Sequence, residues 1–180
     1  NLVKQLELAG HAVCVPKLRH TLVTGESCVH RNNGFRWVEF LTDSKVDLII
    51  HNAALVGTDV VALHPEEAFD TNIEGTRNIC WAANQTNIPV CYLGTSVIYD
   101  AAKYQTEMIT ELSDMRPHTV YGQQKLKAEH IVRDSMIKYM IIRPLFAYGG
   151  VGDMNSLISK GFYAAATKGM WQGGKEVSPL

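Results

Sequence analysis

The stretch Asp47-Leu-Ile-Ile-His-Asn-Ala-Ala54 decides the fold. Residues 46–50 are almost continuously apolar, which is typical of a strand buried on both faces of a parallel sheet. Polar and small residues, His51 to Ala54, follow directly where this strand would end. Ligands of such sheets bind beyond the carboxyl ends of the strands. The two alanines therefore suit the close approach of a flat ligand, although they equally suit a tight exit from the strand.

The segments on both sides of this strand alternate between helix and strand patterns. Toward the N-terminus, we predict a helix over 2–8 that ends at Gly10, a strand over 12–15 and a helix over 35–41. Toward the C-terminus, we predict helices from Pro65 to about Asn84, from Thr119 to about Met136 and over 154–168, with strands over 90–93 and 139–142. This alternation predicts an α/β fold with a doubly wound, Rossmann-like parallel sheet.

Composition excludes several classes of protein. The chain has 180 residues, 46% of them hydrophobic, which suits one globular domain with a core. A net charge of -1 argues against binding of nucleic acid, and there is no apolar run of about 20 residues to span a membrane. The four cysteines form no close pairs, which favours free thiols in a reducing cytoplasm, and histidines and cysteines show no spacing for a metal site.

Three residues are candidates for catalysis. Tyr121 and Lys125 are four positions apart at the start of a predicted helix, so they share one face. A nearby lysine cation favours the phenolate and lowers the pKa of a tyrosine, so the pair can move a proton to or from a substrate oxygen. Thr95 follows the strand over 90–93, where its hydroxyl can bind the same oxygen. Taken alone, the pair also suits a solvated helix edge, and Thr95 a strand-end turn.

Five blocks of sequence together resemble one family. They are Asp47–Ala54, Asn72-Ile-Glu-Gly-Thr-Arg-Asn78, Leu93-Gly-Thr-Ser-Val-Ile-Tyr99, Tyr121-Gly-Gln-Gln-Lys-Leu-Lys-Ala-Glu129, and Arg143-Pro144 with Tyr148-Gly149. In this order and spacing they resemble the extended short-chain dehydrogenase/reductases, which are NAD(P)-dependent epimerases, dehydratases and reductases of nucleotide sugars. The resemblance covers about residues 2 to 150.

The resemblance implies a role for each candidate residue. Tyr121 would be the catalytic acid/base, Lys125 would tune it and bind the nicotinamide ribose, and Thr95 would be the catalytic hydroxyl residue. Hydride would pass between the nicotinamide and a sugar carbon while Tyr121 exchanges the proton on the attached oxygen. Further candidates for binding the cofactor are Asn52, Ala53, Ala54 and Pro144, and those for binding the substrate are Thr95, Ser96 and Phe146.

The resemblance is incomplete at both ends. The family opens with a strand and a glycine-rich loop that holds the pyrophosphate, and this sequence shows neither. Residues 21–25 look like the start of such a loop, but no further glycine follows at the needed spacing. We therefore expect residues 1–150 to be a partial cofactor-binding domain and 151–180 the start of a truncated substrate-binding region.

Lys17 and Arg19 bear on the choice of cofactor. Lys17 stands where NAD-preferring relatives usually carry an acidic residue, Arg19 follows two positions later, and cations there suit the 2′-phosphate of NADP. NADP is therefore slightly favoured over NAD, unless both residues are ordinary surface charges.

The resemblance implies that the substrate is a nucleotide sugar. Ser96-Val97 replaces the Asp-Glu pair of the dehydratases, and Phe146 replaces an asparagine frequent in epimerases. These differences slightly favour a reductase of a dTDP-4-keto-6-deoxy sugar over an epimerase. A regulatory protein that kept the fold without turnover is a third possibility. The helices that begin at Pro65 and Thr119 are candidates for a homodimer interface.

Overall fold

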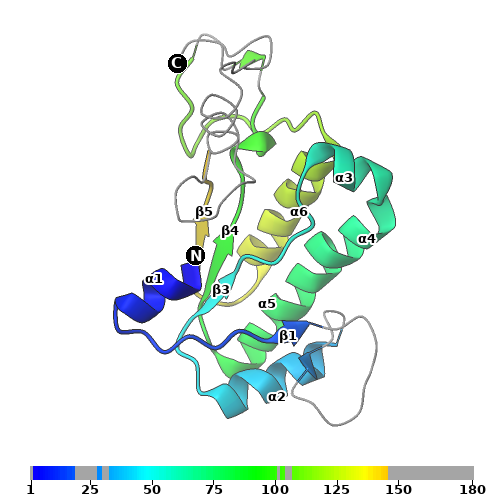
Figure 1. Ribbon diagram of the computed structural model, residues 1–180. Helices are drawn as coiled ribbons and strands as arrows, with labels where there is room; N and C mark the ends of the chain where they lie inside the picture. The colour runs from blue at the N-terminus through cyan, green and yellow to red at the C-terminus, as the bar shows by residue number, and fades with distance from the viewer. Residues whose placement is uncertain (1, 19–27, 30–32, 101, 104–106, 146–180) are drawn as a thin grey trace, which may run out of the picture.

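The computed structural model describes residues 2–18, 28–29, 33–100, 102–103 and 107–145. Its helices and strands alternate along the chain (Figure 1). They are α1 (Leu2–Leu8), β1 (Lys17–Leu18), β2 (Cys28–Val29), α2 (Gly34–Ser44), β3 (Ile49–His51), α3 (Thr58–Leu63), α4 (Pro65–Phe69), the π-helix η1 (Asp70–Glu74), α5 (Gly75–Thr86), β4 (Val90–Leu93), the 3-10 helix η2 (Ser96–Ile98), α6 (Val120–Asp134) and β5 (Tyr139–Ile142).

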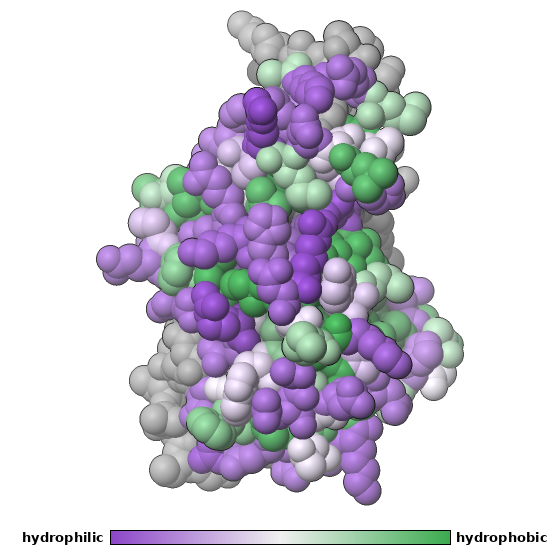
Figure 2. Space-filling view, turned by 180° about the vertical axis from the view of Figure 1, so that it is seen from behind, coloured by the Kyte–Doolittle hydropathy of each residue, from purple (hydrophilic) through white to green (hydrophobic). Residues whose placement is uncertain are grey.

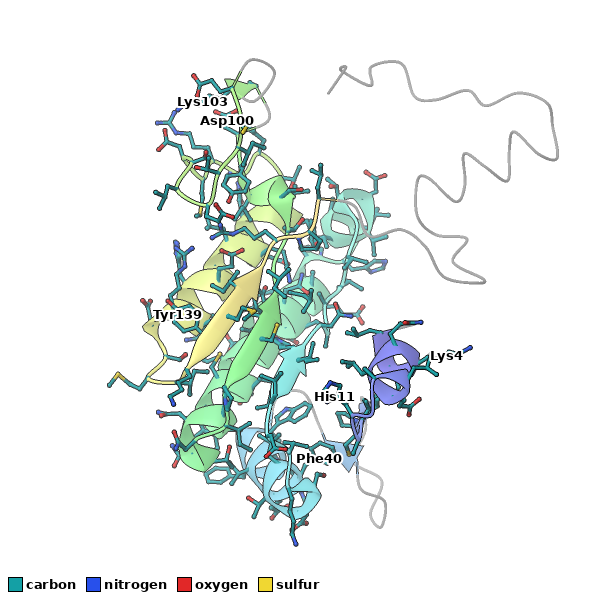
Figure 3. All side chains as sticks on the ribbon, turned by 90° about the vertical axis from the view of Figure 1, so that its left-hand side faces the viewer. Lys4, His11, Phe40, Asp100, Lys103 and Tyr139 are labelled. Carbon is teal, nitrogen blue, oxygen red and sulfur yellow. The ribbon has the colours of Figure 1, made fainter. Side chains whose placement is uncertain are left out.

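The five strands within the described residues pair in parallel, as the α/β prediction requires. β3, β4 and β5 form one sheet in that order, with Ile49 opposite Val90 and Val90 opposite Tyr139. β1 and β2 form a separate two-stranded pair. Figure 3 shows β5, β4 and β3 side by side, with α1 beyond the β3 edge. Parallel strands joined by helical connections confirm the predicted α/β fold class.

The main core lies between the sheet and the helices α5 and α6. Val90 and Tyr92 of β4 pack there against Cys80 and Ala83 of α5 and Val132 of α6, all nearly inaccessible to solvent. A second cluster joins α2 to α5 through Trp37, Leu41, Ile79 and Ala82. These two clusters fix α5 and α6 against the strands, and so fix the level at which α6 begins.

The long helix predicted from Pro65 to about Asn84 is confirmed, with one irregularity. Pro65 occupies the first turn of α4, and α5 ends before Asn87, which adopts a left-handed conformation with φ of 55°. Between α4 and α5 the chain forms one π-helical turn that buries Asn72 and Ile73. Such turns are rare in proteins overall, but those that occur are often found at functional sites.

Two predicted strands differ from the structure. Residues 12–15 form no strand, and β1 lies just after them. In the described part of the chain, Lys17 and Leu18 are the residues of this segment that pair with a neighbouring strand, β2. The strand predicted over 46–50 is β3, Ile49–His51, and its isoleucines are half-buried rather than buried on both faces. Within the described residues β3 pairs with β4 alone. Val46 instead packs beside the α2–α5 cluster, and Leu48 is 49% exposed.

The remaining predictions concern the loops and the surface. Residues 107–118 form neither helix nor strand, and Lys103 has 3-10 conformation. The predicted helix over 154–168 and the region 151–180 lie outside the described residues. In the described part of the chain, no helix is both long enough and apolar enough to span a membrane. The face seen in Figure 2 is mostly hydrophilic, with hydrophobic residues in small separate groups, as on ordinary globular proteins.

Candidate functional site

The carboxyl ends of the three sheet strands bring distant segments of the chain together. Gly94, just after β4, donates its N–H to the carbonyl of Ile142 at 2.7 Å, and Ser96 donates to the carbonyl of Pro144 at 3.4 Å. The segment that carries Asp100 and Lys103 lies at this same end of the sheet (Figure 3). The predicted substrate residue Ser96 and the predicted cofactor residue Pro144 are therefore neighbours, and both are half-buried.

The start of α6 lies against the segment that follows β4. Thr119 caps the helix by accepting a hydrogen bond from the N–H of Gly122 at 3.0 Å. Gly122 packs so closely that an added Cβ would lie 2.9 Å from the carbonyl oxygen of Val97. Only glycine allows this approach, which brings the first turn of α6, with Tyr121, to the level of Thr95.

The hydroxyl of Thr95 lies close enough to Tyr121 to influence the ionisation of its phenol. Thr95 is 8% exposed and caps the short helix η2, because its hydroxyl oxygen accepts a hydrogen bond from the N–H of Val97 at 3.3 Å. Burial raises the pKa of Tyr121, and the Thr95 hydroxyl, which favours the phenolate, opposes this shift. The sequence predicted that Lys125 lowers this pKa. In the structure burial outweighs any such effect, and Thr95 is the residue that acts against it.

Lys125 lies one turn further along α6 and is only 3% exposed. Its ammonium group donates to the carbonyl of Leu93 at 2.6 Å and lies 4.3 Å from the centre of the Tyr92 ring. Burial lowers the pKa of Lys125 to about 8, although the charge of Glu129 acts in the opposite direction. At neutral pH the side chain is therefore mainly a cation, held directly below the end of β4.

A buried polar network behind these residues was not predicted from the sequence. Asn72, in the π-helical turn, holds the loop after β3 by accepting from the N–H of Leu55 at 2.8 Å and donating to its carbonyl at 3.1 Å. Its amide also donates to the Oε1 atom of Gln124 at 2.9 Å. The loop that contains Asn52, Ala53 and Ala54 is thus fixed relative to α6. The only signal in the sequence was the position of Asn72 in one of the family blocks.

His51 extends this network from the end of β3. Its Nε2 atom lies 2.9 Å from the hydroxyl of Thr76, which donates in turn to the carbonyl of Asn72 at 2.7 Å. Burial, and then the nearby charge of Lys125, lower the pKa of His51 to about 4. His51 is therefore neutral at neutral pH and adds no second cation to the site.

Glu129 and Arg143 form a buried ion pair next to the site. The side chains are 0% and 10% exposed, and the Arg143 Nη2 atom lies 2.9 Å from Oε2 of Glu129. The Nε atom of Arg143 contacts both carboxylate oxygens at 3.1 Å, while Nη1 donates to the hydroxyl of Tyr99 at 2.7 Å. This pair joins α6 to the end of β5 and so holds the Arg143-Pro144 segment in place.

The structure brings most of the predicted site residues to one edge of the sheet. Asn52 and Ala53 are exposed and Ala54 is half-buried, so the backbone after β3 is open to a ligand. Lys17 is the first residue of β1. Arg19 and Phe146 lie outside the described residues, as does the side chain of Lys17.

This edge fits the end of a nicotinamide cofactor. It combines an accessible backbone with small side chains, a buried ammonium group with donors to spare beyond its bond to Leu93, and two hydroxyl groups. A ribose offers hydroxyl groups to such donors, and a flat ring needs the small side chains. The chemistry of these groups is therefore compatible with NAD(P).

Comparison with known proteins identifies the family. The model of the RmlD substrate binding domain matches residues 2–160. The chain is 30% identical over 170 residues to the probable low-salt glycan biosynthesis reductase Agl14 of Haloferax volcanii, covering 92% of this chain and 55% of that protein. It is 30% identical over 112 residues to a dTDP-4-dehydrorhamnose reductase of Sinorhizobium fredii, covering 62% of this chain and 37% of that protein. The chain thus spans about half the length of these relatives or less.

The fold is shared with solved structures of similar proteins. A crystal structure of dTDP-4-dehydrorhamnose reductase from Bacillus anthracis, in complex with NADP, superposes with a TM-score of 0.67 at 22% identity, covering 76% of this chain and 47% of that one. At this identity the similarity shows the fold alone, which agrees with the Rossmann-like prediction. Because the family model covers most of the chain, the protein belongs to the RmlD substrate binding domain family, and its predicted kinship with the extended short-chain dehydrogenase/reductases is confirmed.

Proposed function

We propose that the protein containing this chain is an NADPH-dependent reductase that reduces the keto group of a nucleotide sugar, with a dTDP-4-keto-6-deoxy sugar as the preferred substrate. The observation that carries the proposal is the placement of Thr95 beside Tyr121, with the buried ammonium group of Lys125 one turn further along α6. Reductases among the relatives named above support the substrate class.

Tyr121 supplies the proton in this proposal. Because burial raises its pKa, the phenol keeps its proton at neutral pH and can donate it to a carbonyl oxygen. A raised pKa suits the reductive direction, in which the tyrosine must begin the reaction protonated. The hydroxyl of Thr95 binds the same substrate oxygen, and the Lys125 cation stabilises the phenolate that remains. NADPH, when bound, supplies the hydride to the sugar carbon.

The cofactor is held by the residues around the carboxyl ends of β3 and β5. The backbone of Asn52, Ala53 and Ala54 and the ring of Pro144 line it, while the free donors of Lys125 bind the nicotinamide ribose. Lys17 and Arg19 bind the 2′-phosphate, which makes NADP the preferred form.

The test uses the intact protein with NADPH and a dTDP-4-keto-6-deoxy sugar, and follows the loss of NADPH absorbance. Replacing Tyr121 by Phe removes the proton donor, so turnover falls by about 10²–10⁴-fold while the affinity for NADP stays unchanged. Tyr139→Phe is the matched control, because Tyr139 is 46% exposed at the opposite end of β5. It leaves both turnover and affinity unchanged.

Other outcomes select the alternatives. Full turnover in the Tyr121→Phe variant contradicts the assignment of the proton donor. Interconversion of two sugar epimers without net loss of NADPH indicates an epimerase, and cofactor binding without any turnover indicates a regulatory protein. A clear preference for NAD over NADP shows that Lys17 and Arg19 do not bind a 2′-phosphate. The homodimer through α4–α5 and α6, and the cytoplasmic location, remain predictions.

A further inference from the structure

Tyr92 is a buried residue that the proposed reaction does not use. It lies on β4 with 1% of its surface exposed, and its hydroxyl has no hydrogen-bond partner among the described residues. Burial raises the pKa of this phenol far above its usual range, so it stays neutral and does not compete with Tyr121 as an acid/base. A tyrosine that is buried without a hydrogen bond to its hydroxyl needs another physical explanation for its presence in the core.

The ring of Tyr92 provides that reason through its contact with Lys125. The ammonium nitrogen lies 4.3 Å from the ring centre and donates to the carbonyl of the next residue, Leu93, at 2.6 Å. The face of an aromatic ring carries partial negative charge, and its attraction for a cation is strongest where water is excluded. Lys125 is 3% exposed, so this condition is met.

The other charged and titratable groups around Lys125 only partly compensate the charge of its ammonium group. Glu129, on the same helix, is bonded by three donor–acceptor contacts to Arg143, with Arg133 at 3.7 Å, so its negative charge is largely compensated. His51 approaches from β3, but its pKa of about 4 leaves it neutral. Tyr121, on α6, is also neutral because its pKa is raised. Among the described residues, Glu129 favours the cation through its remaining charge, while the groups in direct contact with the ammonium are the Leu93 carbonyl and the Tyr92 ring.

We infer that Tyr92 is a positioning residue for Lys125: its ring face, together with the Leu93 carbonyl, holds the ammonium group in place and keeps it charged below the catalytic tyrosine. An aliphatic residue at this position would fill the same core but would offer the buried cation no compensation. The consequence for catalysis rests on the proposed function, whereas the contact itself does not.

The test measures the pKa of Lys125 directly in the intact protein. Side-chain NMR of ¹³C,¹⁵N-labelled lysine follows the titration, and the Lys125→Arg variant assigns the signal. Tyr92→Leu removes the ring and lowers the pKa of Lys125 by about one unit. Tyr92→Phe, the matched control, keeps the ring and leaves this pKa within about 0.3 units. Replacement of Tyr92 by pentafluorophenylalanine keeps the shape, reverses the charge of the ring face, and lowers the pKa as the leucine does.

These outcomes separate the inference from its alternatives. Equal shifts in the Leu and Phe variants, no shift with the fluorinated ring, or a rise in pKa upon Tyr92→Leu would each overturn it. The fluorinated variant decides the matter if the leucine variant does not fold. In the active enzyme, the alkaline side of the kcat profile moves to lower pH by the same amount in Tyr92→Leu, with KM unchanged. Should Tyr121→Phe retain turnover while Lys125 shifts as stated, the proposed function fails and the positioning role stands.

Discussion

The buried ion pair between Glu129 and Arg143 allows a quantitative test of the structure. Replacing Arg143 by Met keeps most of the apolar volume but leaves the carboxylate of Glu129, which is 0% exposed, without its main partner. Breaking a buried pair in this way costs about 3–5 kcal/mol, because one uncompensated charge remains in the core. Arg133 lies 3.7 Å from the same carboxylate and can compensate part of the charge, which favours the lower end of this range.

The assay is urea unfolding of the intact protein at neutral pH, with the free energy of unfolding obtained by linear extrapolation. Arg77→Met is the matched control, because Arg77 pairs with Glu74 at a similar distance of 3.2 Å, but the side chains are 55% and 33% exposed. Surface pairs contribute about 0–1 kcal/mol, so this variant stays close to the native stability.

A double variant separates the charge from the packing. Glu129→Gln combined with Arg143→Met replaces the unpaired charge with a neutral amide, so the loss falls to about 1–3 kcal/mol, the cost of a buried polar group without a partner. The reasoning is refuted if Arg143→Met costs no more than Arg77→Met, or if the double variant is less stable than Arg143→Met alone. Either result would mean that the pair is not buried in solution as the structure shows.

Further predictions concern the packing, a helix cap and pH. Gly94→Ala places a Cβ 2.5 Å from Oε1 of Glu129 and lowers the stability by about 1–3 kcal/mol. The control is Gly75→Ala, in a helix, where the nearest atom to the added Cβ is 3.6 Å away, so the stability stays unchanged or rises. The midpoints of urea unfolding compare the two variants. Thr119→Ala removes the cap of α6 and costs about 1 kcal/mol in the same assay, and a neutral result would contradict the capping geometry. His51, with its pKa lowered to about 4 from 6.5, shows no imidazole titration by NMR between about pH 5.5 and 8. Because only the unfolded chain binds this proton between about pH 6.5 and 4, stability falls as the pH drops through that range.

The sequence predicted elements most accurately where a regular pattern of apolar residues continues through the whole element. β4 and β5 lie at the predicted residues, and α6 starts just after Thr119, because short apolar runs and a capping residue define such elements locally. The rule that parallel strands end at one edge correctly placed Thr95 near Tyr121. The prediction of a strand over 12–15 was wrong, because an apolar run forms a strand only when it pairs with a neighbouring strand, and the pairing found here begins at Lys17.

What the sequence determined by itself is the fold class, the family and the residue types at the candidate site. Only the tertiary structure decided the contacts that tune these residues. Lys125 meets Leu93 across 32 positions, His51 meets Thr76 across 25, and Arg143 meets Glu129 across 14. These contacts depend on strand register and on how α6 packs against β4, and no local pattern encodes either. Burial in turn raises the pKa of Tyr121 and lowers that of Lys125, because desolvation depends on the whole fold around each group.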